Sequence, residues 1–325
     1  MQADKILLEI RNLKICFDTY EGVVQAIDGI NLTVFEDETL GIVGETGCGK
    51  SITSMAVLNL VPPSGRIESG EIWFEGENLL TKNNHEIQMI RGSKISMIFQ
   101  DPMVSLNPVF TIGDQITTVL HAHRKLGQKE ARQAAIEVFK QVRLPDAEQM
   151  LDKYPHELSG GMLQRVMIGM SLTCRPRLLI ADEPTTALDV TIQAQILRLM
   201  RDLKGKMQTA VMLITHDLGV VARVCQRVAV MYAGQIVEIA EIKSLFQDPK
   251  HPYTMGLLST IPRPGHRGER LHIIQGRVPA LINPPRGCRF HPRCTHALEV
   301  CAQQKPEMVE ISPSHLVACY LYSAL

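Results

Sequence analysis

Residues 44–51, Gly-Glu-Thr-Gly-Cys-Gly-Lys-Ser, fit the pattern G-x-x-x-x-G-K-[ST] at every fixed position. Just before them, residues 39–43 have the composition of a short buried strand, and residues 51–60 have that of a helix. A glycine-rich turn between a strand and a helix directs backbone N–H groups at phosphate oxygens, while Lys50 adds a positive charge and the Ser51 hydroxyl suits Mg²⁺. The segment therefore predicts a phosphate-binding loop.

Three further predicted strands are apolar and end in polar side chains. They are residues 95–99 before Gln100, residues 178–181 before Asp182 and Glu183, and residues 211–215 before His216. Because ligands in α/β sheets meet the carboxyl ends of the strands, these side chains are candidates for one site. Asp182 suits Mg²⁺, Glu183 suits a base that takes a proton from water, and His216 suits contact with a transferring phosphoryl group. The alternatives are an acidic strand end that faces solvent and a structural histidine.

Residues from about 111 to 154 have a helical pattern throughout, which predicts a helical insertion. The apolar residues of one predicted helix face recur at i, i+4, i+7 and i+11: Ala131, Ala135, Val138 and Val142. The insertion leads into residues 158–165, where two glycines follow Ser159. Ser159 suits the cap of the next helix, and the unpaired N–H groups behind it form a second potential anion site. A simple helix cap is the alternative.

Two parts of the chain predict antiparallel strands. Residues 7–17 and 23–35 alternate between apolar and polar side chains around a turn at Glu21-Gly22, and residues 71–76 predict a further strand of the same sheet. Residues 227–232 and 235–239 flank Ala233-Gly234 and predict a hairpin.

Tyr20 lies on the connection between the first two predicted strands. An aromatic residue placed shortly before a phosphate loop suits stacking on a nucleotide base, although packing is the commoner role of such a tyrosine.

Length and composition restrict the class of protein. The 325 residues have room for a large core and a smaller appendage. The 34 basic and 34 acidic residues balance, so no global charge favours nucleic acid as a partner. The first ten residues contain no apolar core of signal-peptide length, and no run of about 18 apolar residues occurs. These features predict a cytosolic chain that does not itself span a membrane.

Together and in this order, the motifs resemble those of the nucleotide-binding subunits of ABC transporters. On that resemblance the motifs are Walker A (residues 44–51), the Q-loop (Gln100), the signature (residues 158–164), Walker B (Asp182), the catalytic base (Glu183), the D-loop (Ala187-Leu188-Asp189) and the switch histidine (His216). Glu183, His216 and Gln100 are the implied catalytic residues.

The resemblance also implies which residues contact the nucleotide and its metal. The implied ATP contacts are Tyr20, Gly44, Glu45, Thr46, Gly47, Cys48, Gly49, Lys50, Ser51, Thr53, Ser159, Gly160, Gly161, Gln164, Asp182 and Asp189. The implied Mg²⁺ ligands are Ser51, Gln100 and Asp182. Tyr20 stands where the family places its adenine-stacking aromatic residue, and Phe17 is the alternative.

The implied fold is α/β, a P-loop NTPase (RecA-like) core with an antiparallel β subdomain and an α-helical subdomain at about residues 103–165. Residues 1–247 are the implied nucleotide-binding domain. Prolines become frequent from residue 248 onward, so we expect residues 248–325 to form a loop-rich extension rather than more sheet.

The resemblance further implies a head-to-tail pair of subunits, in which Ser159 and Gly161 of one subunit contact the γ-phosphate held by residues 44–51 of the other. ATP binding then joins the pair, and hydrolysis assisted by Glu183 opens it.

Two segments of the extension narrow the resemblance. Residues 251–254, His-Pro-Tyr-Thr, and residues 287–294, Gly-Cys-Arg-Phe-His-Pro-Arg-Cys, resemble the tail of the dipeptide and oligopeptide importer ATPases. This implies a peripheral subunit at the cytoplasmic face of the cell membrane. Its implied partners are a second ABC ATPase, which is a copy or a relative, two membrane-spanning permease subunits and, indirectly, an extracytoplasmic substrate-binding protein. Some nickel importers look similar, so a nickel or metal-complex importer is an alternative.

Four of the eight cysteines lie close together at the C-terminal end: Cys288, Cys294, Cys301 and Cys319. In a reducing cytosol such a cluster favours metal over disulfides. The spacing C-x5-C-x6-C-x17-C lacks the paired C-x2-C knuckles of zinc ribbons, whereas four thiolates suit a [4Fe–4S] cluster. We expect a four-cysteine metal site that holds a [4Fe–4S] cluster, with zinc and reduced packing thiols as alternatives.

Two other classes of function are less favoured. A soluble ABC ATPase that acts in cluster assembly, on nucleic acid or on ribosomes often has tandem cassettes or a long coiled-coil insertion, and this chain has neither. A regulatory module that binds nucleotide without turnover does not need the complete set of Lys50, Asp182, Glu183 and His216. The sequence therefore predicts an ATPase that uses ATP and Mg²⁺ to drive peptide import, with no nucleic-acid partner.

Overall fold

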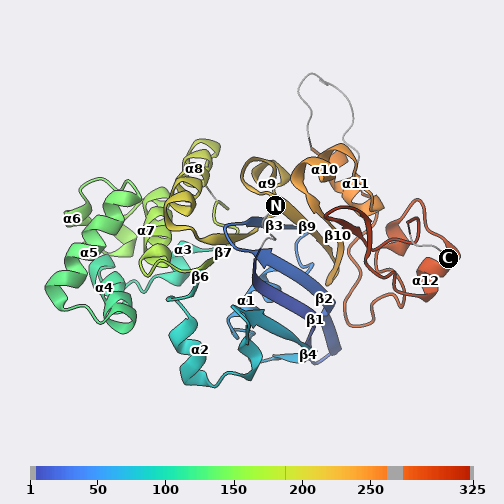
Figure 1. Ribbon diagram of the computed structural model, residues 1–325, viewed down its shortest axis with the longest axis horizontal. Helices are drawn as coiled ribbons and strands as arrows, with labels where there is room; N and C mark the ends of the chain where they lie inside the picture. The colour runs from blue at the N-terminus through green and yellow to red at the C-terminus, as the bar shows by residue number, and fades with distance from the viewer. Residues whose placement is uncertain (1–4, 187, 262–273, 323–325) are drawn as a thin grey trace. The chain divides into compact units, whose positions relative to one another are not determined.

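The computed structural model describes residues 5–186, 188–261 and 274–322 (Figure 1). The chain divides into two compact units. The first unit comprises residues 35–38 and the described part of 82–213, with Lys5. The second comprises residues 6–34, 39–81 and the described residues from 214 onward.

The first unit contains three neighbouring strands in the order β8-β7-β6. They are β6 (Ile95–Ile98), β7 (Leu178–Asp182) and β8 (Ala210–Ile214), and every residue in them is buried. β6 and β7 run parallel, with Ile95 opposite Leu178. Continuous apolar strands are typical of a parallel sheet that is covered on both faces. These strands match the three apolar runs that the sequence predicts.

The helices of the first unit include the predicted insertion, which the structure divides into several pieces (Figure 1). The described helices are α2 (Asn84–Ile90), α3 (Pro102–Ser105), α4 (Ile112–Arg124), α5 (Gln128–Gln141), α6 (Ala147–Met150), η2 (Pro155–Glu157), α7 (Gly160–Leu172) and α8 (Val190–Met207). Lys125 ends α4 with a positive φ of 51°. Arg143, just after α5, has a positive φ of 58°. Such left-handed residues stop a helix, and a single continuous helix over residues 111–154 is therefore not formed.

The predicted apolar face of α5 is largely buried. Ala131, Ala135 and Val142 are enclosed. Val138 is half-buried and packs over Gly169 of α7, where an added Cβ would lie 3.0 Å from Val138 Cγ1. The close approach of α5 to α7 therefore fixes the helix that carries the signature residues.

The second unit contains a small antiparallel sheet in the order β2-β1-β4-β5. Its strands are β1 (Ile6–Thr19), β2 (Gly22–Phe35), β4 (Gly65–Phe74) and β5 (Glu77–Asn78), with η1 (Leu79–Thr81) after them. β1 and β4 pair with Leu8 opposite Phe74 and Ile15 opposite Ile67. β4 thus begins well before the predicted residue 71, because β1 continues to pair beyond its irregularity at residues 11–15.

A larger sheet in the second unit carries the phosphate loop. Its strands in this unit are, in order across the sheet, β11 (Val309–Ser312), β12 (His315–Val317), β10 (Gln235–Glu241), β9 (Arg227–Tyr232) and β3 (Thr39–Val43). β3 runs parallel to β9. β9 and β10 (Gln235–Glu241) form the predicted hairpin. The helices of this unit are α1 (Lys50–Val57), α9 (Leu218–Val224), α10 (Ile242–Gln247), α11 (Pro252–Ser259), η3 (His291–Arg293) and α12 (Glu299–Gln303).

The expectation of an extension without further sheet is wrong. β11 (Val309–Ser312) and β12 (His315–Val317) form a hairpin, and β12 pairs antiparallel with β10 (Figure 1). Pro313 lies in the turn of this hairpin, where proline needs no ladder hydrogen bond. Glu238 of β10 is fully buried and lies 2.7 Å from His315 Nε2, so a polar contact fixes the added strand. The frequency of prolines in the sequence indicates neither the hairpin nor the contact between Glu238 and His315.

Candidate nucleotide-binding site

The phosphate loop lies between β3, which ends at Val43, and α1, which begins at Lys50. Gly44 leaves no space for a side chain, because an added Cβ would lie 2.1 Å from the backbone oxygen of Met231. Gly49 is the N-cap of α1 and has a φ of 105°, a conformation that favours glycine. The two glycines lead the chain tightly into the helix, so that the first N–H groups of α1 face the loop. This is an anion-binding geometry.

Lys50 folds back over the loop. Its side chain is buried, and Nζ donates to the carbonyl oxygens of Gly44 at 2.8 Å and Glu45 at 3.1 Å. The ammonium also lies 3.7 Å from Cys48 Sγ, a weak acceptor that a phosphate oxygen can replace while both carbonyls stay bonded. Thr53 is also buried, and its hydroxyl donates to the carbonyl of Gly49 at 3.0 Å. Thr53 therefore stabilises the end of the loop at Gly49.

Tyr20 and Phe17 differ in their accessibility to a base. Tyr20 is fully exposed at the turn between β1 and β2. Phe17 is half-buried and packs on Gly65, where an added Cβ would lie 2.7 Å from its ring. A stacking platform needs an open ring face. The exposed ring of Tyr20 is therefore better suited than that of Phe17 to stack on a base.

The end of β7 presents two carboxylates in different surroundings. Asp182 is buried, at 3% exposure. Glu183 is half-buried and has a φ of 46°, an uncommon conformation for a residue other than glycine. Its Oε2 accepts hydrogen bonds from Gln100 Nε2 at 3.0 Å and from Thr186 Oγ1 at 2.9 Å. The structure thus brings the predicted Gln100 and Glu183 together at the ends of neighbouring strands.

The predicted magnesium ligands are all oxygen donors. Asp182 has a carboxylate, Ser51 has a hydroxyl and Gln100 has an amide oxygen. Magnesium prefers hard oxygen ligands and commonly takes one or two carboxylates together with phosphate oxygens. The chemistry of the predicted donor set therefore fits Mg²⁺.

The signature residues begin α7. Ser159 is its N-cap residue, and its side chain makes no cap hydrogen bond. Ser159 and Gly160 are exposed, and an added Cβ at Gly161 would lie 3.1 Å from Ile192 Cγ2 of α8. Gln164, one turn further along, is buried at 2% exposure. The part of the signature that solvent reaches is therefore the turn at residues 159–161.

The D-loop and the switch histidine lie at other element ends. Asp189 caps α8, and its Oδ1 accepts two backbone N–H bonds of 3.0 and 2.9 Å in the first turn. This capping role was not predicted, although aspartate before a helix is a recognised signal for it. Ala187, also predicted in the D-loop, lies outside the described residues. His216 is exposed in the turn between β8 and α9.

Sequence reasoning missed the contact between the C-terminal extension and the phosphate loop. The backbone N–H of Glu45 donates to the hydroxyl of Tyr253 at 2.9 Å. The carboxylate of Glu45 accepts from Arg293 Nη1 at 3.0 and 3.2 Å. Tyr253 and Arg293 belong to the two tail segments, residues 251–254 and 287–294, that the sequence analysis identified. The sequence did not predict that these segments contact the phosphate loop.

The four C-terminal cysteines meet around one small cavity. Cys288, Cys294, Cys301 and Cys319 all line it, and its volume of about 10 Å³ has room for about one water molecule. Burial raises the pKa of Cys288 to about 11 and also raises the pKa of Cys294 and Cys319, so these thiols are protonated at neutral pH.

The expected four-cysteine metal site is not supported by this geometry. Among the residues that the structure describes, no group of three or more His, Cys, Asp or Glu side chains is arranged to hold a metal ion. The spacing of the cysteines predicts their convergence. It does not predict how closely the four side chains pack around so small a cavity.

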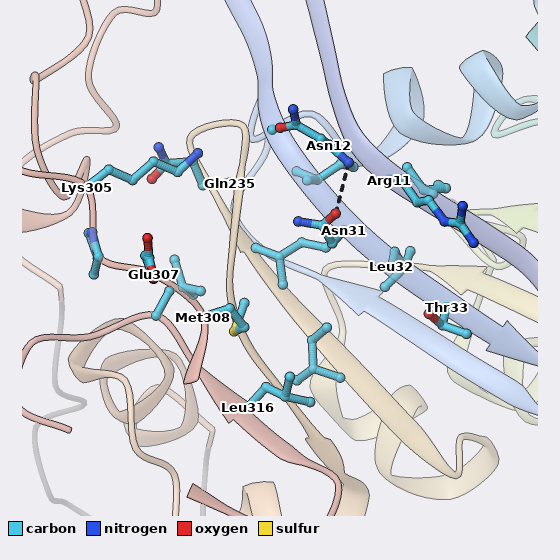
Figure 2. Close-up of a pocket in the computed structure, with 18 of the residues that line it drawn as sticks. Arg11, Asn12, Asn31, Leu32, Thr33, Gln235, Lys305, Glu307, Met308 and Leu316 are labelled. Atoms are coloured by element: carbon cyan, nitrogen blue, oxygen red, sulfur yellow. Dashed lines mark hydrogen bonds between the residues drawn. The ribbon is translucent and has the colours of Figure 1, made fainter. Parts of the chain in front are cut away.

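A larger cavity of about 730 Å³ lies in the second unit (Figure 2). Arg11 and residues 31–33 line it from β1 and β2, and Gln235, Lys305 and Leu316 line it from the hairpin and the tail. No predicted nucleotide contact is among its lining residues. Its lining mixes both charges with apolar side chains and so favours no single class of ligand.

No described helix has both the length and the apolar composition needed to cross a bilayer.

Two protein-family models match the chain. The model described as ABC transporter matches residues 27–186. The model described as Oligopeptide/dipeptide transporter, C-terminal region, matches residues 237–301.

Curated relatives align over nearly the whole chain. The oligopeptide transport ATP-binding protein OppD of Bacillus subtilis (strain 168) is 52% identical over 97% of this chain and 88% of its own length. The dipeptide transport ATP-binding protein DppD of the same organism is 48% identical over 97% and 94%. OppD of Escherichia coli (strain K12) is 47% identical over 98% and 94%.

Solved structures share the fold. One is a dimeric bacterial ABC transporter cassette, with a TM-score of 0.64 and 27% identity over 72% of this chain and 98% of the cassette. Another is a dimeric ATP-binding cassette in a post-hydrolysis state, bound to ADP and phosphate, with a TM-score of 0.64 and 26% identity over the same shares.

Proposed function

The chain belongs to the ATP-binding proteins of oligopeptide and dipeptide ABC transporters, and on that premise we propose how its residues couple ATP hydrolysis to peptide import. One observation carries this function: an ABC transporter match at residues 27–186 and a peptide-transporter match at residues 237–301 lie in the same chain. The relatives reported above are named as oligopeptide or dipeptide transport proteins, which favours peptide over nickel as the solute.

We propose that residues 44–51 hold the phosphates of ATP and that Lys50 neutralises their charge. Ser51, Asp182 and Gln100 would hold Mg²⁺, which would supply positive charge to offset that of the phosphates. Glu183 takes the proton of the attacking water. The hydrogen bonds from Gln100 and Thr186 support this role, because they orient its carboxylate. His216 contacts the transferring phosphoryl group.

The second half of the site is proposed to come from a partner subunit. Ser159 and Gly161 contact the γ-phosphate that residues 44–51 of the partner hold, with Gly160, Gln164 and Asp189 beside them. The exposed N-terminus of α7 supports this, because its first N–H groups and the uncommitted cap side chain are open to an anion. The two cassettes of similar fold are both dimeric.

Contact with the permease is proposed to involve the segment after Gln100. Four apolar side chains there are exposed: Met103, Val104, Val109 and Phe110. Val104 is 83% exposed. Exposed apolar side chains that gather in one short segment mark a surface that another protein covers. Because Gln100 bonds Glu183, a shift of this segment on the permease would reach the catalytic carboxylate directly.

We further propose the assembly in which the chain works. We assign the chain to the cytoplasmic face of the membrane, beside two permease subunits and a second ATPase that is a copy or a relative. A substrate-binding protein contributes only indirectly. Residues 1–247 form the proposed nucleotide-binding domain, and residues 248–325 form the peptide-importer extension.

The assembly is tested by co-purification from detergent-solubilised membranes of the native organism. We expect two membrane-spanning permease proteins to be recovered with the chain. Recovery of ribosomes, or of the chain alone under conditions that preserve other membrane complexes, would contradict the importer and favour a soluble ATPase.

Replacing Tyr20 by Ala is expected to weaken ATP binding about tenfold, because an exposed ring that stacks on a base is worth about 1–3 kcal/mol. Tyr20→Phe keeps the ring and is expected to bind ATP within about twofold of the wild type. The dissociation constant of ATP, measured by calorimetric titration, checks both. A matched Phe17→Ala variant that lost the affinity instead would identify Phe17 as the stacking residue.

The proposed function requires no iron–sulfur cluster, because none of the roles above involves the four cysteines. Iron and acid-labile sulfide analysis of anaerobically purified protein measures the cluster directly. About four iron and four sulfide ions per chain would restore the expected metal site. If the protein contained neither iron nor zinc, the cysteines would be packing residues.

A further inference from the structure

Two described residues of the tail bond the phosphate loop at Glu45. The N–H of Glu45 is bonded to Tyr253, its carboxylate to Arg293, and its carbonyl oxygen to Lys50. Every polar group of this residue therefore has a partner. Tyr253 and Arg293 lie 208 and 248 residues away along the chain.

Arg293 is bonded at each of its three guanidinium nitrogens. Besides Glu45, Nη1 donates to the hydroxyl of Tyr232 at 3.3 Å, Nε to the carbonyl of Gln275 at 2.9 Å, and Nη2 to the carbonyl of Ile274 at 3.3 Å. Its side chain is only 6% exposed. A buried, fully bonded guanidinium holds its carboxylate more firmly than the exposed pairs of this chain do, since solvent screens those.

An aromatic cluster fixes the two hydroxyl groups. The ring centroids of Tyr232 and Tyr253 are 4.6 Å apart, and Phe290 lies 5.1 Å from Tyr232 and 5.4 Å from Tyr253. All three rings are buried. Aromatic rings at such distances stabilise one another in a defined orientation. Burial also raises the pKa of Tyr253, so its hydroxyl is neutral.

The middle of the phosphate loop lacks such support. An added Cβ at Gly47 would meet nothing within 4 Å, so this part of the loop is open. The loop is held by Glu45 at its start, by the Gly234 N–H that donates to the Cys48 carbonyl at 2.8 Å, and by the Thr53 hydroxyl that donates to the Gly49 carbonyl. A loop that is fixed before its ligand arrives loses less conformational entropy on binding.

We propose that Arg293 and Tyr253 are positioning residues for ATP binding. By holding Glu45, they keep the phosphate loop in its binding conformation before the nucleotide arrives. Neither residue needs to touch ATP. The peptide-importer tail is thereby part of the ATP site. The inference rests on nucleotide binding by residues 44–51, as proposed above.

The test compares Arg293→Met, Glu45→Gln and the double variant in the full-length chain. Each single variant is expected to bind ATP about tenfold more weakly, because each removes the charge-assisted bond that fixes the loop. The double variant is expected to bind ATP as tightly as the single variant with the lower affinity, since both changes remove the same contact. For Arg293→Met the KM for ATP rises accordingly, while kcat stays within about twofold, because Arg293 contacts Glu45 and not the reacting atoms.

Two conservative variants exclude loss of the fold as the cause. Arg293→Lys keeps the charge but not the planar fork and is expected to recover part of the affinity. Tyr253→Phe keeps the packed ring, loses only the acceptor of the Glu45 N–H, and is expected to weaken ATP binding about threefold.

Lys305→Met is the matched control. Lys305 belongs to the same tail and pairs with Asp28 at 3.1 Å, but it does not contact the phosphate loop. Its loss is expected to leave the dissociation constant of ATP unchanged. The positioning role is overturned if all variants bind ATP as the wild type does, or if Lys305→Met weakens binding as much as Arg293→Met. A wild-type chain that bound no ATP would instead overturn the proposed function.

Discussion

The Glu183→Gln variant is expected to hydrolyse ATP about 1,000-fold more slowly than the wild type while binding ATP with the same affinity. A carboxamide cannot accept the proton of the attacking water, and loss of a general base costs about 10²–10⁴-fold in rate. The amide oxygen of the new side chain can still accept the bonds from Gln100 and Thr186, so the local geometry is retained. Phosphate release at saturating ATP, together with calorimetric titration, measures both quantities.

Glu137→Gln is the matched control, because Glu137 lies on α5 in an exposed pair with Lys140. Its turnover is expected to stay within about twofold of the wild type. Wild-type turnover in Glu183→Gln would show that another group takes the proton.

The Ser159→Asp variant is expected to turn over ATP about 100-fold more slowly than Ser159→Asn. Asp and Asn have nearly the same shape and are equally good N-caps, so α7 forms in both variants. Only Asp adds a negative charge to a turn that we propose approaches the γ-phosphate of the partner. Removing one such stabilising contact costs about 10²–10³-fold in rate, and a repelling charge should cost at least as much.

The affinity of the isolated chain for ATP is expected to be the same in both Ser159 variants, because the phosphate loop lies on a different element. Formation of ATP-dependent pairs, followed by light scattering in the Glu183→Gln background, should be lost with Asp and kept with Asn. Equal turnover of the two variants would contradict a γ-phosphate contact at Ser159. Loss of ATP affinity in the Asp variant alone would place both halves of the site in one subunit.

The parts of the fold that sequence predicts well are those determined by local chemistry. β3 and β9 begin and end at the predicted residues, because short apolar runs that end at a glycine-containing turn leave little choice. Gly44 and Gly49 mark the phosphate loop because no other residue type fits their surroundings. Gln100 and Glu183 meet because the ends of adjacent parallel strands lie side by side.

The parts that sequence does not predict depend on partners far along the chain. Tyr253 and Arg293 contact Glu45 across 208 and 248 residues, and no local pattern reports such a pairing. β12 joins the sheet through a contact between His315 and the buried Glu238, whereas the surrounding prolines suggest loops. Tertiary contacts of this kind decide the outcome where local propensity is weak.

Reconstitution of the co-purified complex in liposomes tests the central claim most directly. ATP is enclosed with the chain inside, and labelled peptide is supplied outside together with the binding protein. We predict peptide accumulation that depends on ATP and on the binding protein, and that falls to background when the chain carries Glu183→Gln. ATP hydrolysis without peptide accumulation, or accumulation that survives Glu183→Gln, would contradict the assignment of this chain as the subunit that powers peptide import.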